Sequence, residues 1–462
     1  MSTGRKNFFR RGGINLIGII NPREYVQYQR QEQKGAARSK SDQENLKALL
    51  ERVQRHLIEH YNDEFVQAII DEQARNRVKF HISDFIKEQR EFKFSMELQD
   101  VISHIQTEIT EMGVLQPALD DPSISSIEIN SPTEVIVEKD GFPVHMKEIR
   151  FRDVDHLYRT IDKMLAPVGK TLTANEPIID ANYRGFRINV TMDVTRGGVS
   201  TGSPVISIRK FPPDVYSDEE CIKYGNISQE ISNFFRDVIP YGVNVIIAGG
   251  TNSGKTTQLI RLPKYYDPLT RILTIEDSEE MMLKAKTTYK DYPNIASFVV
   301  KDHEDERKAY PIAKLIKMSL RQNPDVIIIG EVRDEYAAQQ ALVAANTGHT
   351  VHLTIHANGP EEAAVRLVQL AGNNRTAASQ VAMTFDLIVF QKYESATGKR
   401  VVFEIAELMD FEGAEKPVLN AIFRYDPENR QFRRTGRLKK AAKKLVVEGA
   451  PPEITQRWCG EG

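Results

Sequence analysis

The stretch Gly249-Gly250-Thr251-Asn252-Ser253-Gly254-Lys255-Thr256 fits the phosphate-loop pattern G-x-x-x-x-G-K-[ST], and it directly follows an apolar run at 243–248. This order predicts a strand that delivers a glycine-rich loop, and a helix from about Lys255 that aims free N–H groups at an anion. Lys255 would reach the β- and γ-phosphates of ATP, and Thr256 would place its hydroxyl on Mg²⁺. We assign nucleotide binding to this stretch and to Thr257.

Composition indicates a soluble multidomain protein. The chain has 462 residues, a formal charge of −2, 40% hydrophobic and 27% charged residues, which suits two or three globular domains. Its two cysteines, Cys221 and Cys459, lack metal-ligand spacing, which favours a reducing, cytoplasmic environment over a disulfide framework or a zinc ribbon. No apolar run is long enough to span a bilayer.

The N-terminal residues 1–43 form a basic segment that we interpret as a flexible arm. The apolar part at 14–20 is too short for an export signal, and no small-residue cleavage site follows it. Such an arm is either simply solvated or touches anionic lipid.

Periodicity divides the rest of the chain. Apolar residues at helical spacing predict a helical region at 44–115, which is a possible docking module. Alternating residues and turns then predict an α+β N-domain at 116–211, with a helix at 154–165. Proline and aspartate at 212–214 begin a predicted linker at 212–226. We predict an ATPase domain at 227–450 and a tail at 451–462.

The predicted ATPase domain alternates strands and helices, which implies an α/β fold with a parallel sheet covered on both faces. The expected strands are 243–248, 271–275, 326–329 and 351–355, and the expected helices include 312–320 and 337–345. A late strand pair, 386–391 and 401–410, is expected at the sheet edge.

Acidic residues near the predicted strand ends are candidates for hydrolysis. Ligands of open parallel sheets lie beyond the carboxyl ends of the strands, so Glu331 faces the phosphates, and Asp325 at the other end is a turn or cap residue. Glu331 would order the attacking water or the Mg²⁺ shell. Glu276 ends another strand at the same edge and is a candidate general base or metal ligand; alternatively, it belongs to an acid-rich helix start.

The segment 347–358 holds three histidines, His349, His352 and His356. In a strand only His352 and His356 share a face, and the segment contains no acid or cysteine, which disfavours a metal site. We expect His349 and His356 at the phosphate edge, where an imidazole could hydrogen-bond the γ-phosphate or its water.

Together these motifs resemble the type II/IV secretion system ATPase superfamily (GspE/PilT-like) over roughly residues 97–450. The phosphate loop corresponds to its Walker A box, 274–277 to its Asp box, 329–334 to its Walker B box, and 349–356 to its His box.

The segments 127–130, 166–169, 186–189 and 208–211 resemble the N-domain of the CpaF/TadA branch. In that branch two arginines of the N-domain reach the nucleotide, and the matching positions are Arg187 and Arg209. A guanidinium pairs well with phosphate oxygens, whereas the simpler interpretation is a surface salt bridge. The missing four-cysteine subdomain favours either this branch or the type IV secretion relatives, whereas the His349 to His356 spacing resembles that of the pilus and general-secretion enzymes.

The resemblance implies a RecA-like domain and a homo-hexamer that binds ATP and Mg²⁺ and acts as a motor. Such an enzyme would lie in the cytoplasm, peripheral to the membrane face, and would power pilus assembly or protein secretion through an integral inner-membrane platform protein.

Three alternatives remain at this stage. One is a type IV secretion or conjugation ATPase. Another is a RecA-like nucleic-acid motor, but the core after residue 97 shows no lysine and arginine stripe, so no direct nucleic-acid binding is expected. The last is a scaffold that binds ATP without hydrolysing it, which Glu276 and Glu331 argue against.

Overall fold

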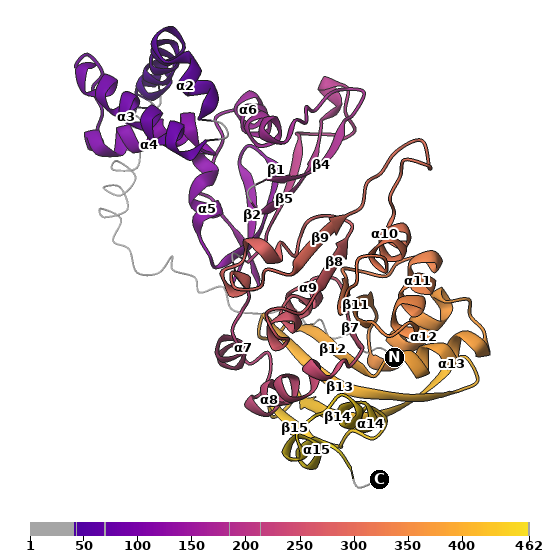
Figure 1. The fold of residues 1–462 in the computed structure, drawn as a ribbon. Helices are drawn as coiled ribbons and strands as arrows, with labels where there is room; N and C mark the ends of the chain where they lie inside the picture. The colour runs from indigo at the N-terminus through magenta and orange to yellow at the C-terminus, as the bar shows by residue number, and fades with distance from the viewer. Residues whose placement is uncertain (1–40, 43, 69–70, 184, 213, 461–462) are drawn as a thin grey trace, which may run out of the picture. The chain divides into compact units, whose positions relative to one another are not determined.

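The computed structural model describes residues 41–42, 44–68, 71–183, 185–212 and 214–460 (Figure 1). The predicted basic arm therefore lies almost wholly outside the described residues. The chain divides into two compact units, Met1–Asp120 with Ile149–Thr171 and Asp121–Glu148 with Leu172–Gly462. Within the described ranges, no helix combines the length and the apolar character needed to cross a membrane.

The first unit is helical, as predicted for the region after residue 44. Its helices bury apolar residues at i, i+4 spacing, for example Val78, Ile82 and Ile86, because this spacing lines one face of a helix. The helix predicted at 154–165 is observed at those bounds and belongs to this unit, where His156 Nε2 lies 2.6 Å from Glu108 Oε1. The helices are residues 44–60, α2 (Asn62–Gln67), α3 (Glu72–Glu88), α4 (Leu98–Thr110), η2 (Gly113–Leu115), α5 (Gln116–Asp120), α6 (Val154–Leu165) and η3 (Ala166–Val168).

The second unit contains an antiparallel six-stranded sheet in the order β3-β2-β1-β6-β5-β4. Its strands are β1 (Ile124–Ser131), β2 (Glu134–Lys139), β3 (Phe142–His145), β4 (Ile178–Tyr183), β5 (Phe186–Thr191) and β6 (Val205–Lys210), with the short helix η4 (Val194–Arg196) before β6. Apolar residues such as Ile188 and Ile208 are buried on one face, and the polar face carries Arg187 directly opposite Arg209. The alternation predicted from the sequence thus places both arginines on the same, accessible face.

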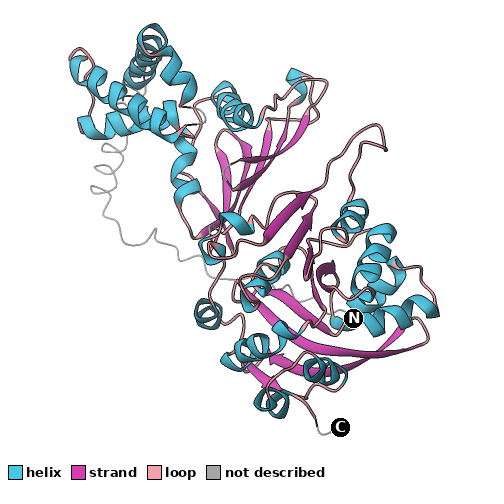
Figure 2. Cartoon of the chain, viewed as in Figure 1, coloured by secondary structure: helices cyan, strands magenta, loops and turns pink. Residues whose placement is uncertain are grey.

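A nine-stranded sheet forms the core of the same unit, in the order β15-β14-β13-β12-β7-β11-β10-β8-β9. Figure 2 draws its strands in magenta. The strands from β7 to β12 run parallel, which confirms the predicted α/β class, and the last three are antiparallel. The strands are β7 (Val245–Gly249), β8 (Ile272–Glu276), β9 (Ile295–Val299), β10 (Val326–Ile329), β11 (Thr350–His356), β12 (Leu387–Glu394), β13 (Lys399–Glu412), β14 (Lys416–Asp426) and β15 (Gln431–Arg434). The predicted late pair is β12 and β13, which β14 and β15 extend.

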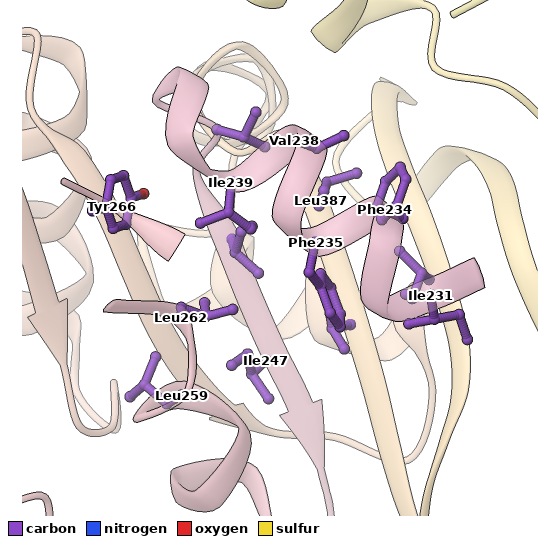
Figure 3. Packing of buried hydrophobic residues seen from close by; sticks show 14 of the residues in the cluster. Ile231, Phe234, Phe235, Val238, Ile239, Ile247, Leu259, Leu262, Tyr266 and Leu387 are labelled. Atoms are coloured by element: carbon purple, nitrogen blue, oxygen red, sulfur yellow. The ribbon is translucent and has the colours of Figure 1, made fainter. Parts of the chain in front are cut away.

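Helices cover this sheet on both faces. The strand β7 shows why, because its alternate side chains point to opposite faces and are apolar on both. Val245 and Ile247 belong to one buried cluster, whereas Ile246 and Ala248 belong to the other. The apolar face of α8, including Phe235, packs over Ile247 (Figure 3). The helices are α7 (Asp218–Tyr224), α8 (Gln229–Val238), η5 (Ile239–Tyr241), α9 (Lys255–Leu259), η6 (Leu262–Tyr265), η7 (Leu283–Ala285), η8 (Thr287–Tyr289), α10 (Ile312–Ser319), α11 (Glu335–Asn346), α12 (Pro360–Leu370), α13 (Arg375–Thr384), α14 (Lys440–Val447) and α15 (Pro452–Trp458).

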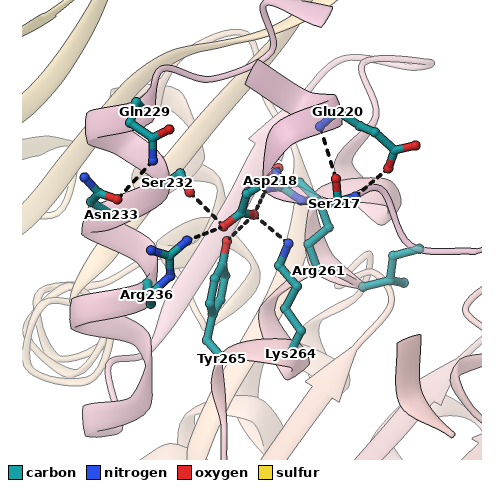
Figure 4. Close-up of polar contacts among 12 residues, drawn as sticks. Ser217, Asp218, Glu220, Gln229, Ser232, Asn233, Arg236, Arg261, Lys264 and Tyr265 are labelled. Carbon is teal, nitrogen blue, oxygen red and sulfur yellow. Dashed lines mark hydrogen bonds and ion pairs between the residues drawn. The ribbon is translucent and has the colours of Figure 1, made fainter. Parts of the chain in front are cut away.

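The segment predicted as a linker, 212–226, contains α7 and is anchored by the buried carboxylate of Asp218 (Figure 4). Arg261, just after the phosphate-loop helix, donates to Asp218 from Nη2 at 2.7 Å, and the Lys264 ammonium and the Tyr265 hydroxyl also donate to it. Burial would raise the pKa of Asp218, but hydrogen bonds from Lys264, Ser232 and Tyr265 and the positive charge of Lys264 hold it well below its ordinary value. The segment is therefore tied to the nucleotide-binding part of the unit.

Candidate functional site

The phosphate loop lies at the carboxyl end of β7, and α9 follows at Lys255, as the sequence predicted. Two loop residues have left-handed backbones, Asn252 with φ of 59° and Gly254 with φ of 90°. At Gly249 a Cβ atom would lie 2.3 Å from the carbonyl oxygen of Gln391, so only glycine fits against the neighbouring strand. These constraints explain the glycine positions of the motif.

The ammonium of Lys255 is buried inside the loop, with only 8% of the residue exposed. Its Nζ donates to the carbonyl oxygens of Gly250 at 2.8 Å and Gly249 at 3.1 Å. Burial lowers the pKa of Lys255 to about 8, and the positive charges of Arg209 and Arg333 act in the same direction. A buried ammonium held by loop carbonyls and crowded by other cations favours an anionic ligand, and the phosphates of ATP fit this requirement.

Glu331 and His356 lie beside Lys255 at the carboxyl edge of the sheet. Glu331 Oε1 is 3.2 Å from His356 Nε2, and both ring nitrogens of His356 lie 3.4 Å from Lys255 Nζ. Arg333 donates to Glu331 Oε2 from Nη2 at 2.7 Å and also pairs with Asp277 at 3.2 Å. The predicted acid and histidine are therefore brought together, and Arg333 joins them although it was not predicted as a site residue.

Glu276 ends β8 at the same edge, and only 3% of it is exposed. Its Oε2 accepts the backbone N–H groups of Glu280 and Met281 at 3.0 Å each, whereas its Oε1 is buried without a hydrogen-bond partner. Burial raises the pKa of Glu276 to about 7, despite these two hydrogen bonds. A carboxylate with a free oxygen and such a pKa is suited to accept a proton near neutral pH.

The expected position of His349 at this edge is wrong. Parallel pairing aligns His356 with Gly249 of the phosphate loop, and His349 precedes the first residue of β11, seven residues and roughly 23 Å of strand away. There its Nδ1 lies 3.1 Å from the carbonyl oxygen of Ala344. The motif suggested proximity, but a strand of this length separates its two ends.

His352 occupies the core rather than the site. It is fully buried, and its Nε2 lies 2.8 Å from the Tyr266 hydroxyl. Burial lowers its pKa to about 3, so the imidazole is neutral. Asp325, which was predicted as a turn or cap residue, instead joins the starts of β8 and β10, because its Oδ2 accepts the backbone N–H of Arg271 at 2.7 Å. Among the described residues, no group of three or more His, Cys, Asp or Glu side chains is arranged to hold a metal ion.

Arg187 and Arg209 occupy facing positions on β5 and β6. Arg187 Nη1 donates to Glu280 Oε1 at 2.9 Å, in the loop that follows Glu276. The charge of Arg209 contributes to the lowered pKa of Lys255. The six-stranded sheet thus presents two guanidinium groups to the nucleotide-binding edge.

Residues distant in the sequence support the loop, and sequence reasoning missed them. Gln391 donates from its side-chain amide to the carbonyl oxygen of Ser253 at 2.8 Å. Arg400 donates from Nε to the carbonyl oxygen of Asn252 at 3.0 Å and pairs with Glu138 at 2.6 Å. Gln391 lies on β12, which pairs with β7, and Arg400 lies on β13, which pairs with β12, so sheet pairing brings both side chains to the loop and no local motif could have identified them.

The phosphate loop can hold the triphosphate of ATP, and Thr256 and Thr257 lie half-buried in the first turn of α9. Thr251 is exposed at the loop tip, and the Ser253 hydroxyl closes the loop by donating to the Gly250 carbonyl at 2.9 Å. The Thr256 hydroxyl is the loop group that would ligate Mg²⁺, which would neutralise phosphate charge.

The parallel sheet, the phosphate loop and the acids at its carboxyl edge define a RecA-like P-loop NTPase domain, preceded by an α+β sheet and a helical region. Residues 108–397 match the type II/IV secretion system protein family, and because this match covers more than half of the chain, the chain belongs to that family.

The chain is similar to several known proteins. It is 28% identical over 323 residues to a protein of Mycobacterium tuberculosis named provisionally for conjugal transfer, which covers 68% of this chain and 89% of that protein. It is 30% identical over 214 residues to the twitching motility protein of Neisseria gonorrhoeae, with coverage of 46% and 51%. The ATPase DotB of Legionella pneumophila is a similar solved structure, at 23% identity and a TM-score of 0.46, over 74% of this chain and 84% of DotB.

Proposed function

We propose that this chain hydrolyses ATP to ADP and phosphate at the edge formed by the phosphate loop, Glu331 and Glu276. The observation that carries the proposal is the position of the buried Lys255 ammonium, within 3.4 Å of His356, which itself contacts Glu331. Cation, histidine and acid meet where the γ-phosphate of a bound nucleotide would end.

In the proposed reaction the oxygen of a water molecule bonds to the γ-phosphorus of ATP while the bond to the bridging oxygen of ADP breaks. Glu276 accepts the proton of that water, because its free Oε1 and raised pKa suit a base at neutral pH. Glu331 orients the water together with His356, and Lys255 stabilises the phosphate charge. Arg209 and Arg187 add positive charge from the six-stranded sheet.

The test is steady-state phosphate release from ATP and Mg²⁺ by the full chain and by Glu331→Gln. We expect the variant to lose 100-fold or more in kcat, as is typical for removal of a group that stabilises the transition state, of order 10²–10³. Glu335→Gln is the matched control, since Glu335 begins α11 and is exposed. Equal activity of wild type and Glu331→Gln would refute the assignment.

We also propose that the activity drives a homo-hexameric motor of the CpaF/TadA type. In this proposal the protein lies in the cytoplasm, peripheral to the membrane, and acts on an integral inner-membrane platform protein to assemble a pilus or secrete a protein. Membership of the secretion family supports a membrane-associated assembly, and the N-domain motifs support the branch. The helical region 44–115 is the proposed docking module.

The motor proposal has two tests. The mass of the full chain with ATP and Mg²⁺ should be six times that of the protomer, whereas a monomer under all conditions would contradict a ring. In the source organism, deletion of the gene should abolish fibre assembly or secretion, and Glu331→Gln should fail to restore it.

The conjugal-transfer name of the mycobacterial relative favours a second candidate, a type IV secretion ATPase, which would instead be needed for DNA transfer. Tight, salt-dependent binding of single-stranded DNA by the purified chain would favour a nucleic-acid motor.

A further inference from the structure

Glu280 makes two contacts that join the two sheets of the second unit. Its carboxylate accepts a hydrogen bond from Arg187 Nη1 at 2.9 Å, so a residue of β5 is held by the loop after β8. Its backbone N–H donates to Glu276 Oε2 at 3.0 Å. A single residue therefore contacts both the candidate base and a candidate phosphate-binding arginine.

The ion pair lies at the nucleotide-binding edge and is only partly exposed. The side chain of Glu280 is 17% exposed and that of Arg187 is 41% exposed. Arg187 faces Arg209 across the β5–β6 pair, and the charge of Arg209 is felt at Lys255. Arg187 is thus one strand away from a cation that already acts on the phosphate-binding lysine.

Carboxylate and phosphate oxygens accept hydrogen bonds from the same in-plane N–H groups of a guanidinium, so they compete for it. We propose that the Glu280 carboxylate occupies Arg187 in place of the nucleotide phosphates, so that Glu280 is a positioning residue that releases Arg187 when ATP binds. This inference rests on the proposed nucleotide-binding role of the site and adds a regulatory contact to it.

Release of Arg187 would also change the hydrogen bonding of Glu276. The loop from Glu276 to Met281 closes on itself, because both backbone N–H groups that bind Glu276 Oε2 belong to its far end. If Arg187 leaves Glu280, the loop loses its attachment to β5, and the donors at Glu276 are free to move. Nucleotide binding and the position of the base are therefore linked through one residue.

If the Glu280 carboxylate competes with ATP for Arg187, removing its charge should tighten ATP binding. Arg187 would then be available to the phosphates without first having to leave Glu280. We expect Glu280→Gln to lower the KM for ATP roughly 2- to 5-fold, in keeping with the strength of a partly exposed ion pair. The decrease in KM caused by Glu280→Gln should disappear when Arg187 is also removed, in the double variant Glu280→Gln/Arg187→Ala. Glu280→Ala should give the same lower KM and serves if the glutamine variant folds poorly.

Glu279→Gln is the matched control. Glu279 is the exposed neighbour, and in the described part of the chain the ion pair of Arg187 is formed with Glu280 alone. The negative charges of Glu279 and Glu280 both raise the pKa of Glu276, after burial as the largest cause. Both variants should therefore move the acidic limb of the kcat/KM profile to lower pH, but only Glu280→Gln should lower KM.

The outcomes are distinguishable. If wild type hydrolyses ATP and the KM of Glu280→Gln equals or exceeds that of wild type, the competition is refuted while the proposed function stands. If Glu280→Gln lowers the KM for ATP equally with and without Arg187→Ala, the role of Arg187 is refuted. If wild type neither binds nor hydrolyses ATP, the proposed function itself fails. A lower KM that requires Arg187, with no such effect of Glu279→Gln, supports the proposal.

Discussion

The side chain of Glu138, on β2 of the six-stranded sheet, accepts a hydrogen bond at 2.8 Å from the amide of Asn252 at the tip of the phosphate loop. Arg400 completes a triangle with both residues, since its Nη2 lies 2.6 Å from Glu138 Oε1 and 3.1 Å from Asn252 Oδ1. The tip of the loop, with its left-handed Asn252, is therefore held from β2 and β13.

Arg400→Ala should weaken ATP binding, because the loop tip loses two donors and Glu138 keeps an unpaired charge. We expect the KM for ATP to rise about 10-fold, which corresponds to about 1.4 kcal/mol, with a smaller effect on kcat. Arg424→Ala is the control, since Arg424 on the adjacent β14 is 61% exposed and pairs with Glu404 at 3.3 Å. A KM equal to that of the control would show that the triangle does not support the loop.

The pH dependence of kcat/KM should be bell-shaped with a narrow maximum. Glu276 must be ionised to accept a proton, and burial raises its pKa to about 7, so activity should fall below that pH. Lys255 must be protonated to bind phosphate, and burial lowers its pKa to about 8, so activity should fall above that pH. Lys255→Arg should remove the alkaline limb, because guanidinium stays charged. A flat profile from about pH 6 to about pH 9 would contradict both assignments.

Gly330→Ala should impair catalysis by displacing Glu276. A Cβ atom at Gly330 would lie 3.0 Å from the Cβ of Glu276 and 3.4 Å from its Cα, which is too close without movement. We expect kcat to fall about 10-fold or more, since small displacements of a reacting group are costly. Gly359→Ala is the control, because no atom lies within 4 Å of its Cβ position and φ is −171°. Unchanged kcat in Gly330→Ala would argue against Glu276 as the base.

Asp218→Asn should destabilise the second unit. The substitution leaves the guanidinium of Arg261, which is 1% exposed, without its carboxylate, and loss of one partner of a buried pair costs about 3 kcal/mol. Arg236→Ala should cost less than about 1 kcal/mol, because Arg236 is 56% exposed and 3.5 Å away. Urea denaturation measures both, and equal costs would refute the buried network.

The same carboxylate should contribute to acid sensitivity. Because the folded state holds the pKa of Asp218 below its unfolded value, its stabilisation is present above about pH 4 and is lost as the pH falls through the folded value. Asp218→Asn should therefore reduce the difference in stability between neutral and acidic solution.

Local patterns predicted the parallel core well, because each buried strand is a short apolar run bounded by turns. The strand Val326–Ile329 and the helix Val154–Leu165 were predicted at their observed bounds. By contrast, β14 was missed because its burial does not alternate regularly, and its pairing with β13 contains two register shifts.

The proximity of Lys255, Glu331 and His356 was predictable, because for these residues motif and strand direction coincide. His349 was misplaced because its motif spans a whole strand, so its two ends lie at opposite edges. Glu280, Gln391 and Arg400 were missed since their contacts join segments far apart in the chain. Such long-range contacts follow from sheet order, which the pattern of a single sequence does not specify.

If both sheets contribute to the proposed ATP hydrolysis site, then Arg209 of the six-stranded sheet must act on the bound nucleotide. The measurement is kcat for phosphate release at saturating ATP and Mg²⁺ by the full chain carrying Arg209→Ala, beside the exposed control Arg196→Ala on η4. We expect a loss of about 10²- to 10³-fold for Arg209→Ala, since a guanidinium at the phosphates acts on the transition state, and no change for the control. Wild-type kcat in Arg209→Ala would refute a site shared by the two sheets, because the nine-stranded sheet would then hydrolyse ATP without the six-stranded one.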